Sequence, residues 1–469
     1  MAERLSAREV VALVADDFAE IPYPQRQSKP DGPLAWQGYD ASRARAAERT
    51  GEQESVICGT AHVEGTRAVL IAFEFGFLGG SLGERTGDRL EAAYSYAREH
   101  RLPVVPLVAT GGSRMQEGML ALTQLQRVAR QSALTRAAGL PQIAVLRDPT
   151  TGGGWATLGA GADVVLALPG AQVGFAGSRV RPADADPTAY TAEAQVAAGA
   201  ADAVVQPREL RETLGLWLRL LARPSGGTGD GTADGRTPDT APAPAPVPAP
   251  LGTGDLPATG WDAVRRARST ERPRAEAYLD AYFTHRAAVS GDRCGGTDPG
   301  MLCGFGEHLG RTVAYAAQTG TATRPAGYRT ATRLIRLADR LCIPVLTLVD
   351  TPGAANDAEA ERQGAGAAIA ELFTTVAAAR TPITSLLIGE GGSGGALALA
   401  APGNTYATPD SYFSVIAPEL AAAILKRPPE EVEVTADQLR IRPQDLVELG
   451  VIAPPDGRNP HSAAPRPAP

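Results

Sequence analysis

Lysine is almost absent from this chain of 469 residues: Lys29 and Lys426 are the only two among 45 basic side chains. A P-loop needs its lysine within G-x-x-x-x-G-K-[ST], and neither lysine has that context. The run Asp350-Thr351-Pro352-Gly353 therefore does not indicate a nucleoside triphosphatase. Neither lysine lies in a Met-Lys-Met setting or in an apolar pocket typical of a Schiff base. Any swinging prosthetic arm must come from another protein.

Cysteine is scarce too. The four cysteines form no C-x-x-C pair, which excludes a disulfide framework and a zinc ribbon and leaves no expected metal site; they are Cys58, Cys294, Cys303 and Cys342. We interpret them as small buried apolar side chains.

Long apolar runs and strong positive charge are also missing. No stretch of eighteen apolar residues predicts a membrane span. A net charge of -7 without a long basic stripe argues against nucleic acid as a partner. The start, Met1 to Leu5, lacks a charged-then-apolar signal segment, so we expect a cytoplasmic protein.

Glycine and proline are abundant, with 52 and 38 residues, and they punctuate an internal repeat. Segment 102–107 aligns with 342–348 through Pro103 and Pro344, which are 241 residues apart (344 minus 103). Segment 141–146 aligns with 382–387 at the same offset. Glycine-rich turns follow all four segments, at 109–112, 150–154, 350–354 and 391–396. Two copies of one fold, facing each other across one site, are therefore expected.

Apolar runs alternate with helical patterns in both halves, which favours βα units. We expect strands at 68–73, 104–108, 143–146, 311–315, 345–349 and 383–388. We expect helices at 85–100, 115–138, 329–341, 358–379 and 394–400.

Composition divides the chain into four parts. Residues 223–258 are rich in Gly, Thr, Pro and Ala and predict a disordered linker, because they offer little apolar surface to bury. Residues 456–469 predict a disordered tail. The expected domains are 1–222 and 259–455.

A glycine pair between a strand and a helix lets backbone N–H groups approach a negative oxygen closely. Two such turns per half could form an oxyanion hole. The alternative, that the glycines only close tight connections, stays open. No histidine lies in the turns, and no G-x-S-x-G or H-E-x-x-H motif is present. Three carboxylates adjoin the turns and could serve either as helix or turn caps or as acid–base groups: Glu117, Asp148 and Glu390. Backbone donors without an evident protein base suit a reaction whose cofactor brings its own base.

At these residues the chain resembles the carboxyltransferase of acetyl-CoA carboxylase, a branch of the crotonase-like superfamily, with β and α subunits fused in that order. The β-like motifs are 79–84, 111–118, 148–153 and 174–177. The α-like motifs are 261–268, 291–293, 327–329, 350–354 and 389–398. The resemblance covers about residues 30 to 455.

The resemblance implies an α/β fold of two crotonase-like ββα-superhelix domains in tandem, related by the internal repeat. It implies transfer of a carboxyl group from carboxybiotin, carried on a separate protein, to the α-carbon of an acyl-CoA, giving a malonyl-CoA-type product through an enolate. The implied partners are an acyl-CoA, a biotin carboxyl carrier protein, a biotin carboxylase and further copies of this chain in a homo-oligomer.

The resemblance also carries roles for individual residues. The expected oxyanion donors are Gly152, Gly153, Gly394, Gly395 and Ala396. The expected substrate and CoA contacts are Gly111, Gly112, Ser113, Arg114, Gly154, Trp155, Gly177, Arg329, Gly353 and Ala354. Arg114, Arg179 and Arg329 are expected to meet CoA phosphates.

The sequence departs from the family pattern in four places. The N-terminal zinc ribbon of bacterial β subunits is missing. Trp155 replaces a small residue and is expected to crowd the pocket beside the hole. Segment 318–323 is short, and Ala355 replaces a tyrosine that often follows Pro-Gly-Ala. These departures suit a specialised enzyme.

Three alternatives stay open on the same fold: a malonyl-CoA-type decarboxylase, a biotin-independent acyl-thioester enzyme and a non-catalytic acyl-CoA-binding homologue. A hydratase or isomerase is disfavoured, because no pair of glutamates is evident.

Overall fold

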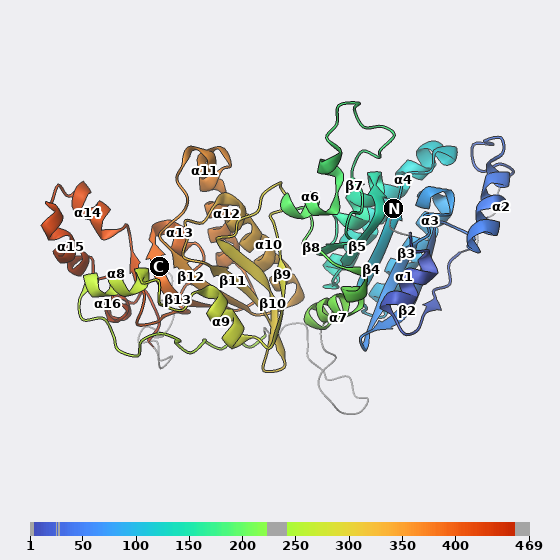
Figure 1. Cartoon of the computed structure of the whole chain (residues 1–469). Coiled ribbons are helices and arrows are strands. Elements are labelled where there is room, and N and C mark those ends of the chain that lie inside the picture. The colour runs from blue at the N-terminus through green and yellow to red at the C-terminus, as the bar shows by residue number, and fades with distance from the viewer. Residues whose placement is uncertain (1–3, 25, 27–28, 223–241, 455–469) are drawn as a thin grey trace, which may run out of the picture. The chain divides into compact units, whose positions relative to one another are not determined.

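The structure is a computed structural model that describes residues 4–24, 26, 29–222 and 242–454. The chain divides into two compact units (Figure 1). Among the described residues, the N-terminal unit comprises those up to 222 and Arg293–Gly296, and the C-terminal unit comprises the others from 242 to 454.

The N-terminal unit is built on a mixed sheet in the order β1-β2-β3-β4-β5-β6-β8, with β7 paired to β5. The strands are β1 (Ala19–Glu20), β2 (Val56–Val63), β3 (Thr66–Phe73), β4 (Val104–Thr110), β5 (Ile143–Thr151), β6 (Val164–Ala167), β7 (Val173–Gly174) and β8 (Ala203–Val204). An antiparallel hairpin joins β2 to β3, and the sheet is parallel from β3 onward.

Helices connect these strands. They are α1 (Ala7–Val14), α2 (Tyr39–Thr50), α3 (Glu84–Glu99), α4 (Gly118–Ala137), α5 (Gly152–Gly154), α6 (Ala192–Ala197) and α7 (Leu210–Leu221). A π-helix, Trp155–Gly159, continues directly from α5.

The C-terminal unit repeats this plan in the order β14-β13-β12-β11-β10-β9, with β15 paired to β13. Its strands are β9 (His285–Val289), β10 (Met301–His308), β11 (Arg311–Gln318), β12 (Val345–Thr351), β13 (Ile383–Gly392), β14 (Thr405–Ala407) and β15 (Tyr412–Ser414). Its helices are α8 (Gly260–Arg268), α9 (Ala275–Tyr282), α10 (Pro325–Leu341), α11 (Ala358–Arg362), α12 (Ala365–Ala378), α13 (Ser393–Leu397), α14 (Pro418–Ile424), α15 (Val432–Gln438) and α16 (Pro443–Glu448).

Central strands are buried on both faces, which explains their continuous apolar runs. All seven residues of β4 and all seven of β12 are buried. In the N-terminal unit, β3 and α3 share a core in which Ile71, Phe73, Leu90 and Tyr94 are fully buried. Each such side chain stabilises the fold by about 2 kcal/mol relative to an exposed one.

The expected fold class is confirmed: both units are α/β, and the expected strands and helices all lie at observed ones. Two long helices are interrupted. The segment expected at 115–138 begins with a 3-10 turn, Met115–Glu117, before α4. The segment at 358–379 divides into α11 and α12 at Gly364, which has φ +79°.

The offset of 241 residues holds in the backbone itself. Strand β4 spans 104–110 and β12 spans 345–351, so both their ends keep the offset. The register between β4 and β5 shifts between Val108 and Thr110, and that between β12 and β13 shifts between Val349 and Thr351. Even this irregularity is thus repeated.

The expected linker departs from its prediction where the structure describes it. We call residues 242–253 the strap. Ala245 is only 3% exposed within the core of the C-terminal unit. Its carbonyl accepts a hydrogen bond from Thr384 Oγ1 at 2.9 Å, and that of Pro246 accepts one from the Tyr282 hydroxyl at 2.8 Å. Carbonyl acceptors, which composition does not reveal, therefore hold the strap. The remainder, 223–241, and the expected tail, 456–469, lie outside the described residues.

Within the described part of the chain, no helix has the length and hydrophobicity needed to cross a bilayer. No cluster of His, Cys, Asp and Glu suited to a metal ion is found among the same residues.

Candidate active site

The two glycine turns of the N-terminal unit lie side by side. They follow β4 and β5, which are neighbouring parallel strands, so their carboxyl ends reach the same edge of the sheet. A Cβ atom added to Gly152 would lie 3.2 Å from Gly112 Cα. The structure therefore brings Gly111 and Gly112 next to Gly152, Gly153 and Gly154.

The first turn is fixed by a second loop. Gly111 N donates to Gly79 O at 2.9 Å, and Leu82 N donates to Gly112 O at 2.9 Å. Gly112 N donates to Thr110 Oγ1 at 3.0 Å. Both N–H groups of the expected glycine pair are therefore engaged within the protein, and Gly111 and Gly112 form a wall of the site without donating into it.

The second turn supplies the free donors. Gly152, with φ +63°, donates its N–H to Phe175 O at 3.1 Å, so it too serves the fold. The N–H groups of Gly153 and Gly154 open α5, and no acceptor for them is found in the described part of the chain. The first N–H groups of a helix have no partner within it and favour negative charge. The N–H groups of this turn that remain available to a ligand are those of Gly153 and Gly154.

The C-terminal unit shows the same arrangement 241 residues later. Gly353 N donates to Thr351 Oγ1 at 3.2 Å, as Gly112 does to Thr110. Thr323 pairs with Ala354 as Leu82 pairs with Ser113. Ser113 and Ala354 therefore occupy equivalent positions in the loops of the two units.

The helix entry of the C-terminal unit is also equivalent. Ser393 has φ +57°, matching Gly152, although it carries a side chain. Gly394 and Gly395 follow within the first turn of α13, and their N–H groups find no acceptor among the described residues. Ala396 is the fourth residue after the cap Gly392, the position at which a helix begins its own backbone hydrogen bonds, so its N–H is not one of these free groups. A Cβ atom on Gly394 would meet nothing within 4 Å, so this residue faces open space.

Arg114 does not reach the site, which corrects its expected role as a substrate contact. Its side chain is fully buried and forms an ion pair with Glu54. It also donates to Ser81 O at 2.8 Å and to Glu117 Oε1 at 3.3 Å. Arg114 therefore holds the loops behind the first turn together.

Arg329 is likewise engaged. Its Nε donates to Asp292 Oδ2 at 2.7 Å and its Nη1 to Gln363 O at 3.0 Å, which ties α10 to two loops of its own unit. Of the three arginines expected to meet CoA phosphates, only Arg179 is exposed without a partner among the described residues.

Trp155 does not crowd the pocket, because its ring turns into the protein. It is 8% exposed and packs in a core cluster with Leu146, Val165 and Val173. This corrects the expectation that Trp155 contacts substrate. Gly177, by contrast, lies beside the end of β5, since a Cβ atom there would be 3.6 Å from Thr151 Oγ1.

The three carboxylates that adjoin the turns have structural partners. Glu117 accepts from the Tyr39 hydroxyl at 2.5 Å and from Glu84 N at 2.6 Å, which caps α3. Asp148 accepts from Gln172 N at 3.1 Å. Glu390 accepts from Arg268 Nε at 2.9 Å and from the Tyr412 hydroxyl at 2.8 Å. All three carboxylates thus accept hydrogen bonds from groups of their own unit.

Sequence reasoning missed several polar residues that shape the turns. Thr110 and Thr351 accept the glycine N–H groups, while Thr157, Gln318 and Tyr328 hold glycine carbonyls. The offset of 241 would have found the first two, because it relates Thr110 to Thr351.

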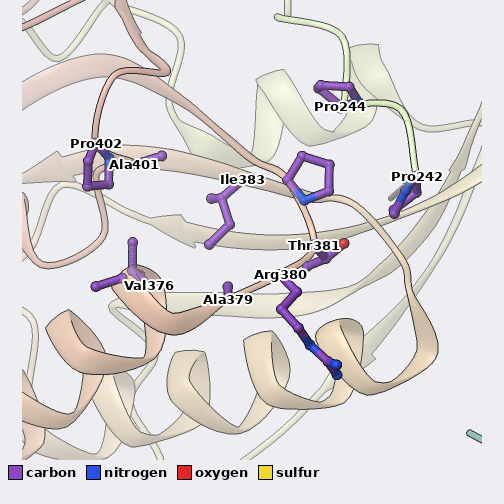
Figure 2. A pocket seen from close by; sticks show the side chains of 11 residues that line it. Pro242, Pro244, Val376, Ala379, Arg380, Thr381, Ile383, Ala401 and Pro402 are labelled. Atoms are coloured by element: carbon purple, nitrogen blue, oxygen red, sulfur yellow. The ribbon is translucent and has the colours of Figure 1, made fainter. Parts of the chain in front are cut away.

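A cavity of about 490 Å³ in the C-terminal unit lies at the other edge of the sheet. Figure 2 shows Pro242 and Pro244 of the strap on one side of it and Ala401 and Pro402 on the other. Ile383, which also lines it, begins β13, whereas the glycine turn follows the end of that strand. The cavity is therefore separate from the candidate active site.

Two protein families match the chain. Residues 35–203 match the carboxyl transferase domain, and residues 257–454 match the acetyl co-enzyme A carboxylase carboxyltransferase-like family. The acetyl-coenzyme A carboxylase carboxyl transferase subunits beta/alpha of Salinispora arenicola are 38% identical over 467 residues, covering 96% of this chain and 81% of the relative. A probable biotin-dependent acyl-coenzyme A carboxylase beta3 subunit of Mycobacterium bovis is 35% identical, covering 88% and 82%.

Solved structures agree on the fold. The transcarboxylase 12S, crystallised as a hexamer with methylmalonyl-coenzyme A and methylmalonic acid bound, aligns with a TM-score of 0.76 at 19% identity, over 96% of this chain and 86% of that one. A single-chain, multi-domain long-chain acyl-CoA carboxylase aligns with a TM-score of 0.69 at 19% identity, over 95% of this chain and 45% of that one.

Proposed function

The chain belongs to the carboxyltransferases of biotin-dependent acyl-CoA carboxylases, and from this premise we propose that it moves a carboxyl group from carboxybiotin on a separate carrier protein to the α-carbon of an acyl-CoA. The product would be a malonyl-CoA-type thioester. The observation that carries the mechanism is the pair of helix entries, each with N–H groups that find no acceptor among the described residues.

The N-terminal unit would hold the thioester oxygen. When the α-proton leaves an acyl-CoA, negative charge moves onto that oxygen, and the N–H groups of Gly153 and Gly154 can stabilise it. One donor of this kind contributes about 3 kcal/mol to stabilising a transition state. Gly112 and Gly177 leave the approach free of side chains, and Arg179 is available for a CoA phosphate.

The C-terminal unit fits the ureido ring of biotin. Gly394 faces open space, and the N–H groups of Gly394 and Gly395, in the first turn of α13, suit the ureido oxygen. Bound carboxybiotin supplies the carboxyl group and, after its loss, a nitrogen base. This agrees with the structural engagement of Glu117, Asp148 and Glu390, because the reaction then needs no carboxylate from the protein.

The partners follow from the same chemistry. A biotin carboxyl carrier protein and a biotin carboxylase would deliver the carboxylated ring. We also propose a homo-oligomer in which the two helix entries of one site come from different copies of the chain.

Gly394 offers the sharpest test. A Cβ atom there meets nothing within 4 Å, so a larger side chain such as leucine begins in the open space beside the donors. Gly153 and Gly395 are poorer targets, since added Cβ atoms would lie 2.4 Å from Leu125 Cδ1 and 2.5 Å from Ala354 N. We expect Gly394→Leu to lower kcat by at least about a hundredfold with unchanged thermal stability.

Gly366→Leu is the matched control, because Gly366 also lies in a helix and also faces open space. The assay follows carboxylation of acetyl-CoA and propionyl-CoA by a carboxylated carrier protein, and the reverse reaction of malonyl-CoA with free biotin, by mass spectrometry. Wild-type turnover in Gly394→Leu would reject the donor site. Release of CO2 from malonyl-CoA without any biotin would favour a decarboxylase.

A further inference from the structure

The carbonyl of Gly395 is held by two buried side chains that come from other elements. The Tyr328 hydroxyl, from α10, donates to it at 3.1 Å, and Gln318 Nε2, from the last residue of β11, donates to it at 3.3 Å. Both residues are completely buried. Two separate parts of the unit thus meet at one peptide group of α13.

Gln318 connects this peptide group to the rest of the edge. Its Nε2 also donates to Thr323 Oγ1 at 3.2 Å, and its Oε1 accepts from Asp350 N at 3.3 Å. The ends of β11 and β12 and the start of α13 are therefore joined through one amide side chain.

Holding this carbonyl fixes the whole peptide group that follows Gly395, because the peptide bond is planar. Gly395 is thereby anchored on its carbonyl side, and its own N–H is one of the proposed donors. Helix α13 has five residues and two glycines, and so short a helix has little stability of its own. The direction of its N–H groups must come from contacts such as these.

Two properties suit Tyr328 to this contact: its hydroxyl stays protonated, and Gly395 leaves room for it. Burial raises the pKa of its hydroxyl, so the group stays protonated and can donate. A Cβ atom on Gly395 would lie 2.6 Å from the hydroxyl oxygen, so only glycine allows this approach.

The N-terminal unit lacks this contact. The residue 241 positions before Tyr328 is Gly87, which aligns with it because α3 begins at 84 and α10 at 325. The residue equivalent to Gly395 is Gly154, and the residue equivalent to Gln318 is Phe77. Neither Gly87 nor Phe77 has a polar side chain, and no side chain among the described residues donates to the carbonyl of Gly154.

We propose that Tyr328 is a positioning residue for the carboxyl-transfer reaction, and that it acts together with Gln318 by orienting the N–H groups of α13. This inference rests on the proposed function of those N–H groups. Tyr328 itself makes no contact with substrate.

Tyr328→Phe tests the inference, because it removes the hydroxyl and keeps the ring. We expect kcat to fall between about tenfold and a hundredfold, the scale of a small misplacement of catalytic groups, while KM for the acyl-CoA stays within about twofold. Gln318→Met, which keeps the length of the side chain and removes its amide, should act in the same direction. Tyr94→Phe is the matched control, since Tyr94 is equally buried in the N-terminal unit and its hydroxyl lies 3.5 Å from Gln142 Oε1.

The outcomes separate this inference from the function it rests on. If Tyr328→Phe keeps the wild-type kcat while Gly394→Leu is inactive, the positioning role is wrong and the donor site stands. If both variants turn over at the wild-type rate, the donor site itself is wrong. If Tyr94→Phe lowers kcat as much as Tyr328→Phe does, the effect is one of stability, and the positioning role is again rejected.

Discussion

Each unit buries an arginine and a carboxylate behind its glycine turns. Arg114 pairs with Glu54 in the N-terminal unit, and Arg272 pairs with Asp350 at 2.6 Å in the C-terminal unit. A glycine makes room in both places: a Cβ atom on Gly83 would lie 2.8 Å from Arg114 Nη1, and one on Gly389 would lie 2.2 Å from Arg272 Nη2. Both ion pairs are buried, but their residues are not related by the offset of 241.

The pair of Glu54 and Arg114 makes stability depend on pH. Burial alone would raise the pKa of the Glu54 carboxyl, but the charge and hydrogen bonds of Arg114 outweigh it and hold this pKa below 4.5. A carboxyl whose pKa is depressed by folding stabilises the fold at a pH above its unfolded value. That contribution is lost as the pH falls through the folded value.

We therefore expect Arg114→Met to lower the free energy of unfolding by about 3 to 5 kcal/mol at pH 7, because it leaves Glu54 buried and charged. Glu54→Gln should lack the part of the pH dependence that comes from the Glu54 carboxyl. The difference in free energy of unfolding between this variant and the wild type should therefore become smaller below pH 4.5. Urea unfolding between pH 3 and 7 measures both effects. Parallel pH profiles for the wild type and Glu54→Gln would contradict the assignment.

These residues also show where prediction from sequence stops. The offset of 241 located every glycine turn, because the turns require backbone conformations that few residues other than glycine adopt. It could not show that the N–H groups of Gly111 and Gly112 are engaged by Gly79 O and Thr110 Oγ1. The directions of Arg114 and Trp155 were also hidden, because a side chain at a helix entry can turn either toward the ligand or into the core.

At the scale of elements, the two helix entries differ in the shape of the helix that follows them. Position 155 is tryptophan, where the repeat has Ala396, and the helix there widens into a π-helix in which Ala160 N donates to Trp155 O at 2.8 Å. Gly159 makes space for the ring: a Cβ atom there would lie 2.5 Å from Trp155 Cε3 and 3.0 Å from Leu146 Cδ2. The wide turn thus accommodates the ring beside the donors, as π-bulges often do at functional sites.

Gly159→Ala should destabilise the protein by roughly 1 to 3 kcal/mol, the usual cost of overpacking a core. Adding Trp155→Leu should relieve the contact, so the double variant should be more stable than the sum of the single changes implies. Chemical denaturation of all four proteins gives the coupling energy. Additive losses would show that Gly159 and Trp155 do not constrain each other.

The elements that sequence reasoning missed were hidden for different reasons. Strands β2 and β10 are the outer partners of hairpins, and they carry glycine and polar residues such as Gly59 and Glu307 in place of a continuous apolar run. The strap was missed because side chains elsewhere in the unit donate to its carbonyls. The longer central strands were predictable, because strands that are buried on both faces have continuous apolar runs. The four-residue strand β6, also fully buried, was not predicted.

At the scale of the whole molecule, each unit has a core of its own, so we expect two cooperative unfolding transitions. Leu70 and Leu346 are fully buried in the N-terminal and C-terminal units, respectively. Each change to alanine should cost about 2 to 5 kcal/mol and lower one transition only. Differential scanning calorimetry of the two variants tests this expectation, and a single transition lowered equally by both changes would show that the units unfold together.

The strap has a practical consequence for anyone who separates the two halves into independent polypeptides. A cut after residue 258, at the compositional border, would strip the C-terminal half of Ala245 and of the carbonyls that Thr384 and Tyr282 bind. A cut before Pro242 keeps the strap with the C-terminal half, whose side chains bind its carbonyl groups. The border between the halves is therefore set by packing, well before the point where the sequence regains an ordinary composition.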